Sequence, residues 1–197
     1  MISYDIAKAI LWPTLGTIWR MKVTGRQNVP ATGPLIVACN HASYFDPPAL
    51  GTACPRRVRY MAKKELFDIP VLGAMIGSFG AYPVDRTGTP MAAIRRSVEV
   101  LRAGGCIGIF PEGTRNRSGQ EEARQGVALL ANLGGAAVVP ACVVGGDQAR
   151  RLHQIKVAFG EPLRLPAGRK ATRDDLAKFT EQVMGEIRSL AERLGGN

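Results

Sequence analysis

Short apolar runs that alternate with amphipathic segments constrain the fold of this 197-residue chain more than any other feature of its sequence. Each run is rich in branched aliphatic residues and is bounded by turn-forming residues, as strands are. The runs cover residues 34–39, 57–62, 80–84, 106–110, 136–144 and 155–160. Strands that alternate with helices predict an α/β domain with a mostly parallel or mixed central sheet flanked by helices.

The segments between the runs carry the signals of helices. Residues 90–104 open with proline and close on glycine, with apolar residues at helical spacing between them. Helices are also predicted over 124–135 and over 172–196, the second of which begins with threonine and has two aspartates in its first turn. A proline pair at 47–48 suits the start of another helix. No repeat or linker divides the chain, so a single domain is predicted.

Composition limits the partners of this domain. The formal net charge is +10, from 26 Lys and Arg against 16 Asp and Glu, so the surface should attract nucleic acid, anionic lipid or an acidic protein. Basic residues are not interleaved with aromatic ones and no nucleic-acid motif is present, so we expect no nucleic-acid partner. The four cysteines lack ligand-like spacing. They predict buried free thiols in a reducing compartment, with neither a disulfide nor a metal site.

The N-terminal segment, residues 1–22, predicts an amphipathic helix at a membrane interface. Its longest uncharged stretch runs from Ala9 to Trp19 and has 11 residues, whereas a helix needs about 20 to span a bilayer. Trp12 and Trp19 are seven residues apart, which places them on one face of a helix, and basic residues flank them. Tryptophan with nearby cations suits the headgroup region of an anionic membrane. The alternative is a helix packed on the protein's own core.

His41 stands just after the run 34–39, with Asp46 five positions later. Ligand sites in α/β proteins gather where strands end. An imidazole can take a proton from an alcohol near neutral pH, and a carboxylate on its other ring nitrogen fixes the tautomer. The pair therefore suits a general base. The structural alternative is that Asp46 caps the helix that follows and His41 bonds the backbone.

A glycine-containing turn with charged neighbours follows the run 106–110 and suits a phosphate. Gly113 permits a tight turn in which backbone N–H groups converge, the hydroxyl of Thr114 adds a donor, and the guanidinium of Arg115 can bind two phosphate oxygens at once. Glu112 is expected to hold an arginine or a backbone group in place. Arg86, which follows the run 80–84, can join the same site. The alternative is a surface turn that carries arginines.

Four blocks, "NHASYFD", "GAYPVDR", "FPEGTR" and "VVPACVVG", resemble in order and spacing the blocks of the glycerolphosphate acyltransferase superfamily. The similarity is greatest to bacterial 1-acylglycerol-3-phosphate acyltransferases and extends over most of the chain. It implies an acyltransferase domain over residues 23–197, after the interfacial helix of residues 1–22. It also implies that His41 and Asp46 are the catalytic pair.

The resemblance assigns roles to the remaining candidates. The residues implied for the acceptor-phosphate site are Arg86, Glu112, Gly113 and Arg115. Arg124 stands where the family usually carries a lysine, which keeps the charge but changes the geometry. Pro140 belongs to the fourth block, which is linked to packing of the acyl chain or the acceptor.

The implied reaction moves a fatty acyl group from acyl-CoA or acyl carrier protein to the free hydroxyl of a lysophospholipid. The first expectation is 1-acylglycerol-3-phosphate, giving phosphatidic acid in phospholipid biosynthesis, with no cofactor or metal. The protein is expected to be peripheral, on the cytoplasmic face of an anionic membrane. Two alternatives stay open: an acyltransferase for another lysolipid or a specialised metabolite, and a non-catalytic protein that binds anionic membranes.

The basic run "RRVRYMAKK", residues 56–64, is a candidate contact for the donor or the membrane. Its charges suit anionic headgroups, CoA phosphates or the acidic helix of an acyl carrier protein. The alternative is a solvated face.

Overall fold

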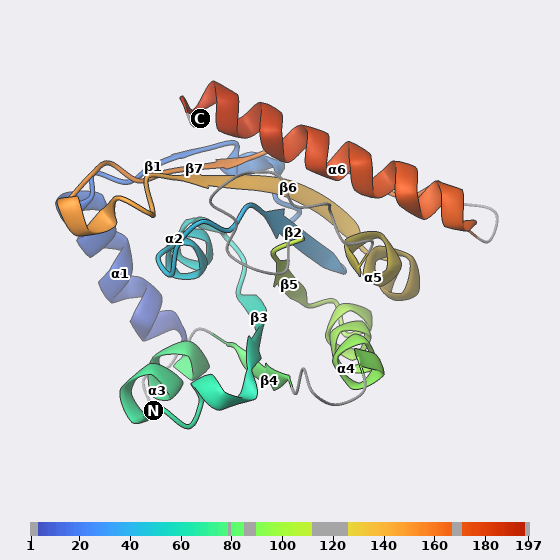
Figure 1. The fold of residues 1–197 in the computed structure, drawn as a ribbon, viewed down its shortest axis with the longest axis horizontal. Helices are drawn as coiled ribbons and strands as arrows, with labels where there is room; N and C mark the ends of the chain where they lie inside the picture. Colours follow the sequence, from blue (N-terminus) through green and yellow to red (C-terminus); the bar gives the residue numbers. More distant parts are fainter. Residues whose placement is uncertain (1–3, 79, 85–89, 112–125, 167–170, 196–197) are drawn as a thin grey trace.

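A seven-stranded mixed sheet forms the centre of the molecule (Figure 1). The computed structural model describes residues 4–78, 80–84, 90–111, 126–166 and 171–195. The strand order is β1-β7-β6-β2-β5-β3-β4. The strands are β1 (Lys22–Thr24), β2 (Leu35–Cys39), β3 (Val58–Lys63), β4 (Tyr82–Val84), β5 (Cys106–Ile109), β6 (Ala137–Val144) and β7 (Lys156–Phe159). Strands β6, β2, β5, β3 and β4 run in parallel, whereas β7 and β1 run against them.

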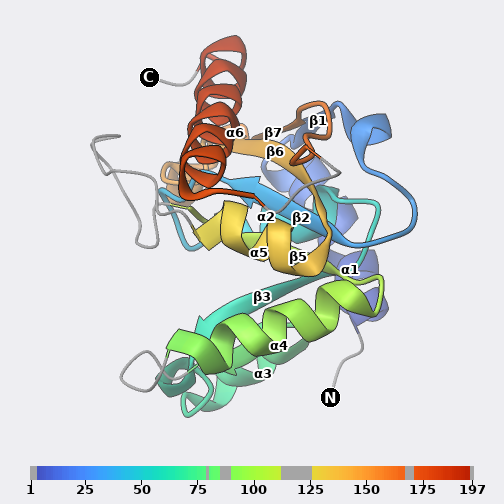
Figure 2. The same ribbon diagram turned by 90° about the vertical axis from the view of Figure 1, so that its right-hand side faces the viewer.

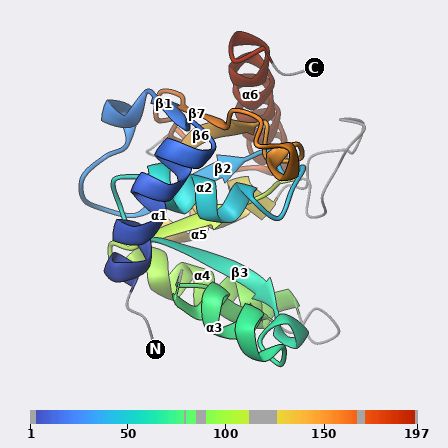
Figure 3. The same cartoon turned by 90° about the vertical axis from the view of Figure 1, so that its left-hand side faces the viewer.

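Helices cover both faces of this sheet. The α-helices in the described ranges are α1 (Tyr4–Ile18), α2 (Asp46–Ala53), α3 (Pro70–Ser78), α4 (Pro90–Arg102), α5 (Gly126–Gly134) and α6 (Arg173–Arg193). The short 3₁₀ turns there are η1 (Arg26–Asn28), η2 (Lys64–Leu66) and η3 (Ala149–Arg151). Helices α4, α5 and α6 pack on one face (Figure 2). Helices α1 and α2 pack on the other (Figure 3).

Strand β2 shows why the central runs are continuously apolar. Ile36 and Ala38 point into the core beneath α4, α5 and α6. Leu35, Val37 and Cys39 point into the core beneath α1 and α2. All five side chains are fully buried, because a parallel strand inside an α/β sheet is covered on both faces. The predicted α/β architecture is confirmed.

The elements agree closely with the predicted ones. Each of the six predicted runs overlaps a strand, and the predicted helices correspond to α1, α2, α4, α5 and α6, whereas α3 was not predicted. Strand β1 was not predicted, because an edge strand of three residues carries no periodicity. All four cysteines are free and buried, as predicted.

The prediction that both tryptophans share one helical face is wrong. Helix α1 ends at Ile18, so Trp19 lies beyond it. The Nε1–H of Trp19 donates to the carbonyl oxygen of Ala149 at 2.7 Å, and its ring centroid lies 5.6 Å from that of Phe45. Trp12 remains 40% exposed on the helix surface. One tryptophan therefore joins α1 to the body of the domain, and only the other faces outward.

Helix α1 itself has two different faces. Ala7 and Leu15 are buried against the domain. Ile6 and Ile10, one turn apart, are 54% and 56% exposed. Packing on the core therefore accounts for one face only. Within the described residues, no helix is both long enough and apolar enough to cross a bilayer.

Gly108 of β5 gives Tyr60 of β3 the room to pack across the sheet. A Cβ at residue 108 would lie 2.3 Å from Cε1 of Tyr60. We therefore expect Gly108→Ala to lower the free energy of unfolding in urea by about 1–3 kcal/mol, the usual cost of overpacking. Gly185→Ala is the control, because nothing lies within 4 Å of a Cβ at that position in α6. It should stabilise the protein by about 0.5–1 kcal/mol, and equal effects of the two changes would contradict this account.

Candidate active site

His41 and Asp46 lie where β2 ends and α2 begins, at the carboxyl edge of the parallel strands. Nδ1 of His41 is 3.1 Å from Oδ2 of Asp46. The side chain of Asp46 is 1% exposed and that of His41 is 18% exposed. The structure thus brings together the pair that the sequence singled out, with the carboxylate buried and the imidazole reachable from solvent.

Asp46 organises the loop that precedes it. Its Oδ2 also accepts hydrogen bonds from the backbone N–H groups of Ala42 and Ser43, each at 2.7 Å. The N-cap of α2 is Phe45, and no side chain caps the helix there. The structural alternative for Asp46, a helix cap, is therefore wrong. The carboxylate binds the histidine and its loop instead, in the first turn of a helix, where the dipole favours negative charge.

These contacts fix the tautomer of the imidazole. An ionised carboxylate can only accept hydrogen bonds, so Nδ1 of His41 is the donor in the pair. In the neutral ring Nε2 then carries the lone pair and is the basic atom. The ring stacks on Phe110, with centroids 4.1 Å apart and planes inclined by 25°. The neighbours of His41 therefore set both the orientation and the tautomer of its imidazole.

Two neighbours of His41 tie this loop to the end of β6. The side-chain amide of Asn40 donates to the carbonyl oxygen of Val143 at 2.9 Å and accepts from its N–H at 2.8 Å. The hydroxyl of Ser43 donates to the carbonyl oxygen of Gly146 at 2.7 Å. Neither Asn40 nor Ser43 was predicted to take part in the site. The sequence hinted at Asn40 and Ser43 only through their closeness to His41, because their hydrogen-bond partners lie 103 residues away in the chain.

Gly146 lies against the buried carboxylate of Asp46. A Cβ at this position would lie 2.4 Å from Oδ1 of Asp46. Oδ1 is buried and has no hydrogen-bond partner among the described residues. Any larger residue at position 146 would clash with this carboxylate, so Gly146 belongs to the site, although no local pattern in the sequence predicted it.

An aromatic wall supports the histidine. The ring of Tyr60 lies parallel to that of Phe110, 6.1 Å between centroids, and its hydroxyl donates to the carbonyl oxygen of Pro47 at 3.0 Å. Burial raises the pKa of Tyr60 well above its usual range. The phenol therefore stays neutral and acts as a support for Phe110 and His41, not as an acid or base.

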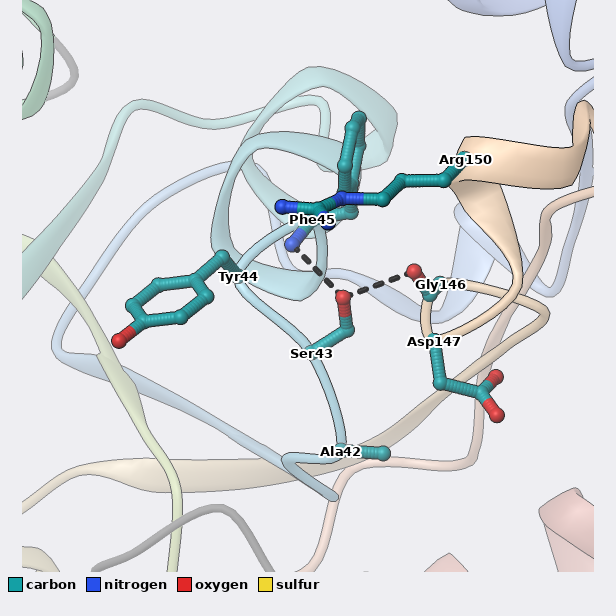
Figure 4. Close-up of a pocket in the computed structure, with 7 residues that line it drawn as sticks. All are labelled: Ala42, Ser43, Tyr44, Phe45, Gly146, Asp147 and Arg150. Carbon is teal, nitrogen blue, oxygen red and sulfur yellow. Dashed lines mark hydrogen bonds between the residues drawn. The ribbon is translucent and has the colours of Figure 1, made fainter.

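A cavity of about 530 Å³ opens beside the histidine loop (Figure 4). Its walls come from the loop after β2 and from the loop after β6. The lining residues are Ala42, Ser43, Tyr44, Phe45, Gly146, Asp147 and Arg150. The cavity thus shares a wall with the loop that Asp46 organises.

The predicted phosphate-site residues lie outside the described residues. They are Arg86, Glu112, Gly113, Thr114, Arg115 and Arg124. The strands that precede them in the chain are described: β4 ends at Val84 and β5 at Ile109. Both strands stand on the same side of β2 in the sheet order. The phosphate site stays a prediction.

Pro140 is buried within β6 and does not line the cavity. Its carbonyl oxygen accepts from the N–H of Gly160 at 2.8 Å just past the end of β7, and two residues earlier Val138 bridges to Leu163 instead. The partner of this side of β6 thus changes from β7 to Leu163 close to Pro140. The N–H group that proline lacks would point to this side, so the buried strand tolerates a proline here. Its predicted role in packing the acyl chain or acceptor stays a prediction.

The basic run at residues 56–64 does not form one free surface. The guanidinium of Arg56 donates to three backbone carbonyl oxygens. Arg57 forms an ion pair with Asp5 of α1, with 2.7 Å between nitrogen and oxygen. Both residues precede β3 and so lie at the opposite edge of the sheet from His41. The charges of these two arginines thus have partners within the fold, and the contact of the basic run with the donor or the membrane stays a prediction.

Known proteins resemble this chain in sequence and in fold. The sequence model of the Acyltransferase family matches residues 20–144. The crystal structure of the 1-acyl-sn-glycerophosphate (LPA) acyltransferase PlsC from Thermotoga maritima matches with a TM-score of 0.71. That match covers 100% of this chain and 85% of the other at 23% identity, which shows a shared fold.

Similar sequences extend this result. The 1-acyl-sn-glycerol-3-phosphate acyltransferase of Bacillus subtilis (strain 168) is 32% identical over 179 residues, 88% of this chain and 89% of its own. The protein of the same name from Streptococcus pneumoniae is 26% identical over 162 residues, 80% of this chain and 60% of its own. Since the family match covers more than half of the chain and includes the histidine loop, the chain belongs to the acyltransferase family.

Proposed function

We propose that this protein transfers a fatty acyl group from an acyl thioester to the free hydroxyl of 1-acylglycerol-3-phosphate, forming phosphatidic acid. The observation that carries the proposal is the 3.1 Å contact of His41 Nδ1 with Asp46 Oδ2 at the carboxyl edge of the sheet. Relatives that are similar over most of the chain are named for this acceptor. The geometry supports His41 as the base, and the names of the relatives support this acceptor.

The reaction needs one proton transfer in each direction. Nε2 of His41 takes the proton of the acceptor hydroxyl as its oxygen attacks the thioester carbonyl. The carbon–sulfur bond then breaks, and the thiolate leaves with the proton that the imidazolium returns. Asp46 stabilises the imidazolium while it exists. General-base help of this kind is typically worth about 10²–10⁴-fold.

The remaining rate enhancement comes from positioning. The predicted arginines of the acceptor-phosphate site, Arg86, Arg115 and Arg124, would hold the phosphate so that the hydroxyl lies beside Nε2. Binding energy of a remote group is thereby used for orientation. The proposed mechanism needs no covalent acyl-enzyme, cofactor or metal, since the histidine and the two substrates supply every reacting atom.

The test is release of free thiol from acyl-CoA and from acyl carrier protein with lysophosphatidic acid as acceptor. His41→Ala should lower kcat/KM by about 10²–10⁴-fold, because it removes the base. The matched control is His153→Ala, which removes the chain's other histidine from an exposed position outside the site. This control should keep wild-type activity.

Each outcome bears on a different part of the proposal. Acceptor-dependent release that survives His41→Ala removes the histidine from the mechanism. Release with another lysolipid, but not with lysophosphatidic acid, keeps the reaction and replaces the acceptor. Comparison of the two thioesters identifies the donor.

The support for action at a membrane comes from α1. We place the protein on the cytoplasmic face of an anionic membrane, as a peripheral protein. Ile6 and Ile10 expose apolar surface on one side of α1, as an interfacial helix does. The formal charge of +10 favours anionic headgroups.

Exchange of both isoleucines tests this surface. The double change Ile6→Asp and Ile10→Asp should weaken binding to vesicles of phosphatidylcholine and phosphatidylglycerol by about tenfold or more, because each buried aliphatic side chain contributes roughly 1.5–3 kcal/mol. The control is Leu133→Asp on α5, an exposed leucine on the opposite face of the sheet. Unchanged vesicle binding, measured by flotation, would make α1 a structural element only.

A further inference from the structure

His41 stands between two halves of the sheet. Strands β5, β3 and β4 lie on one side of β2, and β6, β7 and β1 lie on the other. The residues predicted to bind the acceptor phosphate follow β4 and β5 in the chain. A transfer between two phosphate-bearing substrates needs a second anion site, and no residue of the half that begins with β6 has yet been given a role in binding an anion.

The cavity beside the histidine loop lies on this second side. The loop after β6 supplies its far wall, through Gly146, Asp147 and Arg150. Its near wall includes Ala42 and Ser43, whose N–H groups bind Asp46. The volume of about 530 Å³ is in the usual range for small-molecule sites. A ligand in this cavity lies directly against the loop that carries the base.

Arg150 supplies a cation to the cavity. Its side chain is exposed and forms no hydrogen bond or ion pair with another described residue. Figure 4 shows its side chain extending from η3 toward the histidine loop, whereas the carboxylate of Asp147 turns the other way. Arginine presents a planar fork that matches phosphate oxygens. A cation without a counter-charge in the described part of the chain, at the edge of a cavity, favours an anionic ligand.

The walls that hold Arg150 are fixed before any ligand binds. Ala149, its neighbour in η3, is buried, and its carbonyl oxygen accepts from Nε1–H of Trp19 at 2.7 Å. Ser43 bonds Gly146 across the cavity at 2.7 Å. Trp19 also packs against Phe45, another residue that lines the cavity. The end of α1, the histidine loop and η3 therefore form one preorganised unit, which lowers the entropic cost of binding.

We propose that Arg150 binds the phosphate of the donor's phosphopantetheine arm while the arm lies in this cavity and leads the thioester to His41. This arm and its phosphate are common to acyl-CoA and acyl carrier protein. The inference rests on the proposed function. It places the donor on the β6 side of His41 and the acceptor on the β5 side, with Nε2 between the two reacting groups.

Steady-state kinetics of Arg150→Ala test the assignment. The KM for acyl-CoA and for acyl carrier protein should each rise about tenfold or more, as expected when a charged hydrogen bond is lost. The KM for lysophosphatidic acid should stay unchanged. Acyl-pantetheine, which lacks the phosphate, should serve the variant and the wild type equally well. Arg151→Ala is the matched control, an exposed neighbour outside the cavity lining, and should behave as wild type.

Several results would overturn the assignment. An unchanged donor KM, or a rise in the acceptor KM instead, would remove Arg150 from donor binding. An equal loss with acyl-pantetheine would mean that the arginine acts through the fold. A rise confined to acyl-CoA would move the contact to the nucleotide phosphates. Wild-type protein that transfers no acyl group from any of these thioesters would contradict the proposed function, which separates the two failures.

Discussion

A single carboxylate oxygen holds this site together. Oδ2 of Asp46 receives the N–H groups of Ala42 and Ser43 and the Nδ1–H of His41. The aspartate is almost completely buried, and a buried charge is costly unless hydrogen bonds replace its hydration. The loop from residue 41 to residue 46 closes on its own aspartate for that reason, and in closing it sets the tautomer of the histidine.

Residues of the neighbouring strands and loops fix the position of this loop. Asn40 and Ser43 attach it to the end of β6, and Gly146 leaves the space that the carboxylate occupies. Phe110, at the end of β5, supports the imidazole ring. Because β5 and β6 both pair with β2, the ends of these three strands bring Phe110 and the attachment points of the histidine loop to the same edge of the sheet. The order of the strands therefore determines the chemistry as directly as the motif does.

Local sequence patterns predicted the parts of this arrangement that depend on near neighbours. The apolar run of β2, the interval between His41 and Asp46 and the prolines of α2 are all readable within a dozen residues. The contacts of Asn40 and Ser43 were not predictable, because their partners are 103 residues away and no periodicity records them. The pairing of the tryptophans failed for a related reason. A shared helical face assumes that the helix continues, and α1 ends one residue before Trp19.

The state of the histidine ring is the most direct test of the central claim, that Asp46 holds the proton of His41 on Nδ1 and leaves Nε2 as the base. The chain has only two histidines, so nitrogen NMR of the labelled protein resolves both rings, and His153→Ala assigns them. We predict that neutral His41 carries its proton on Nδ1 in the wild type, and that Asp46→Asn abolishes this preference. A neutral His41 with its proton on Nε2 in the wild type would contradict the account.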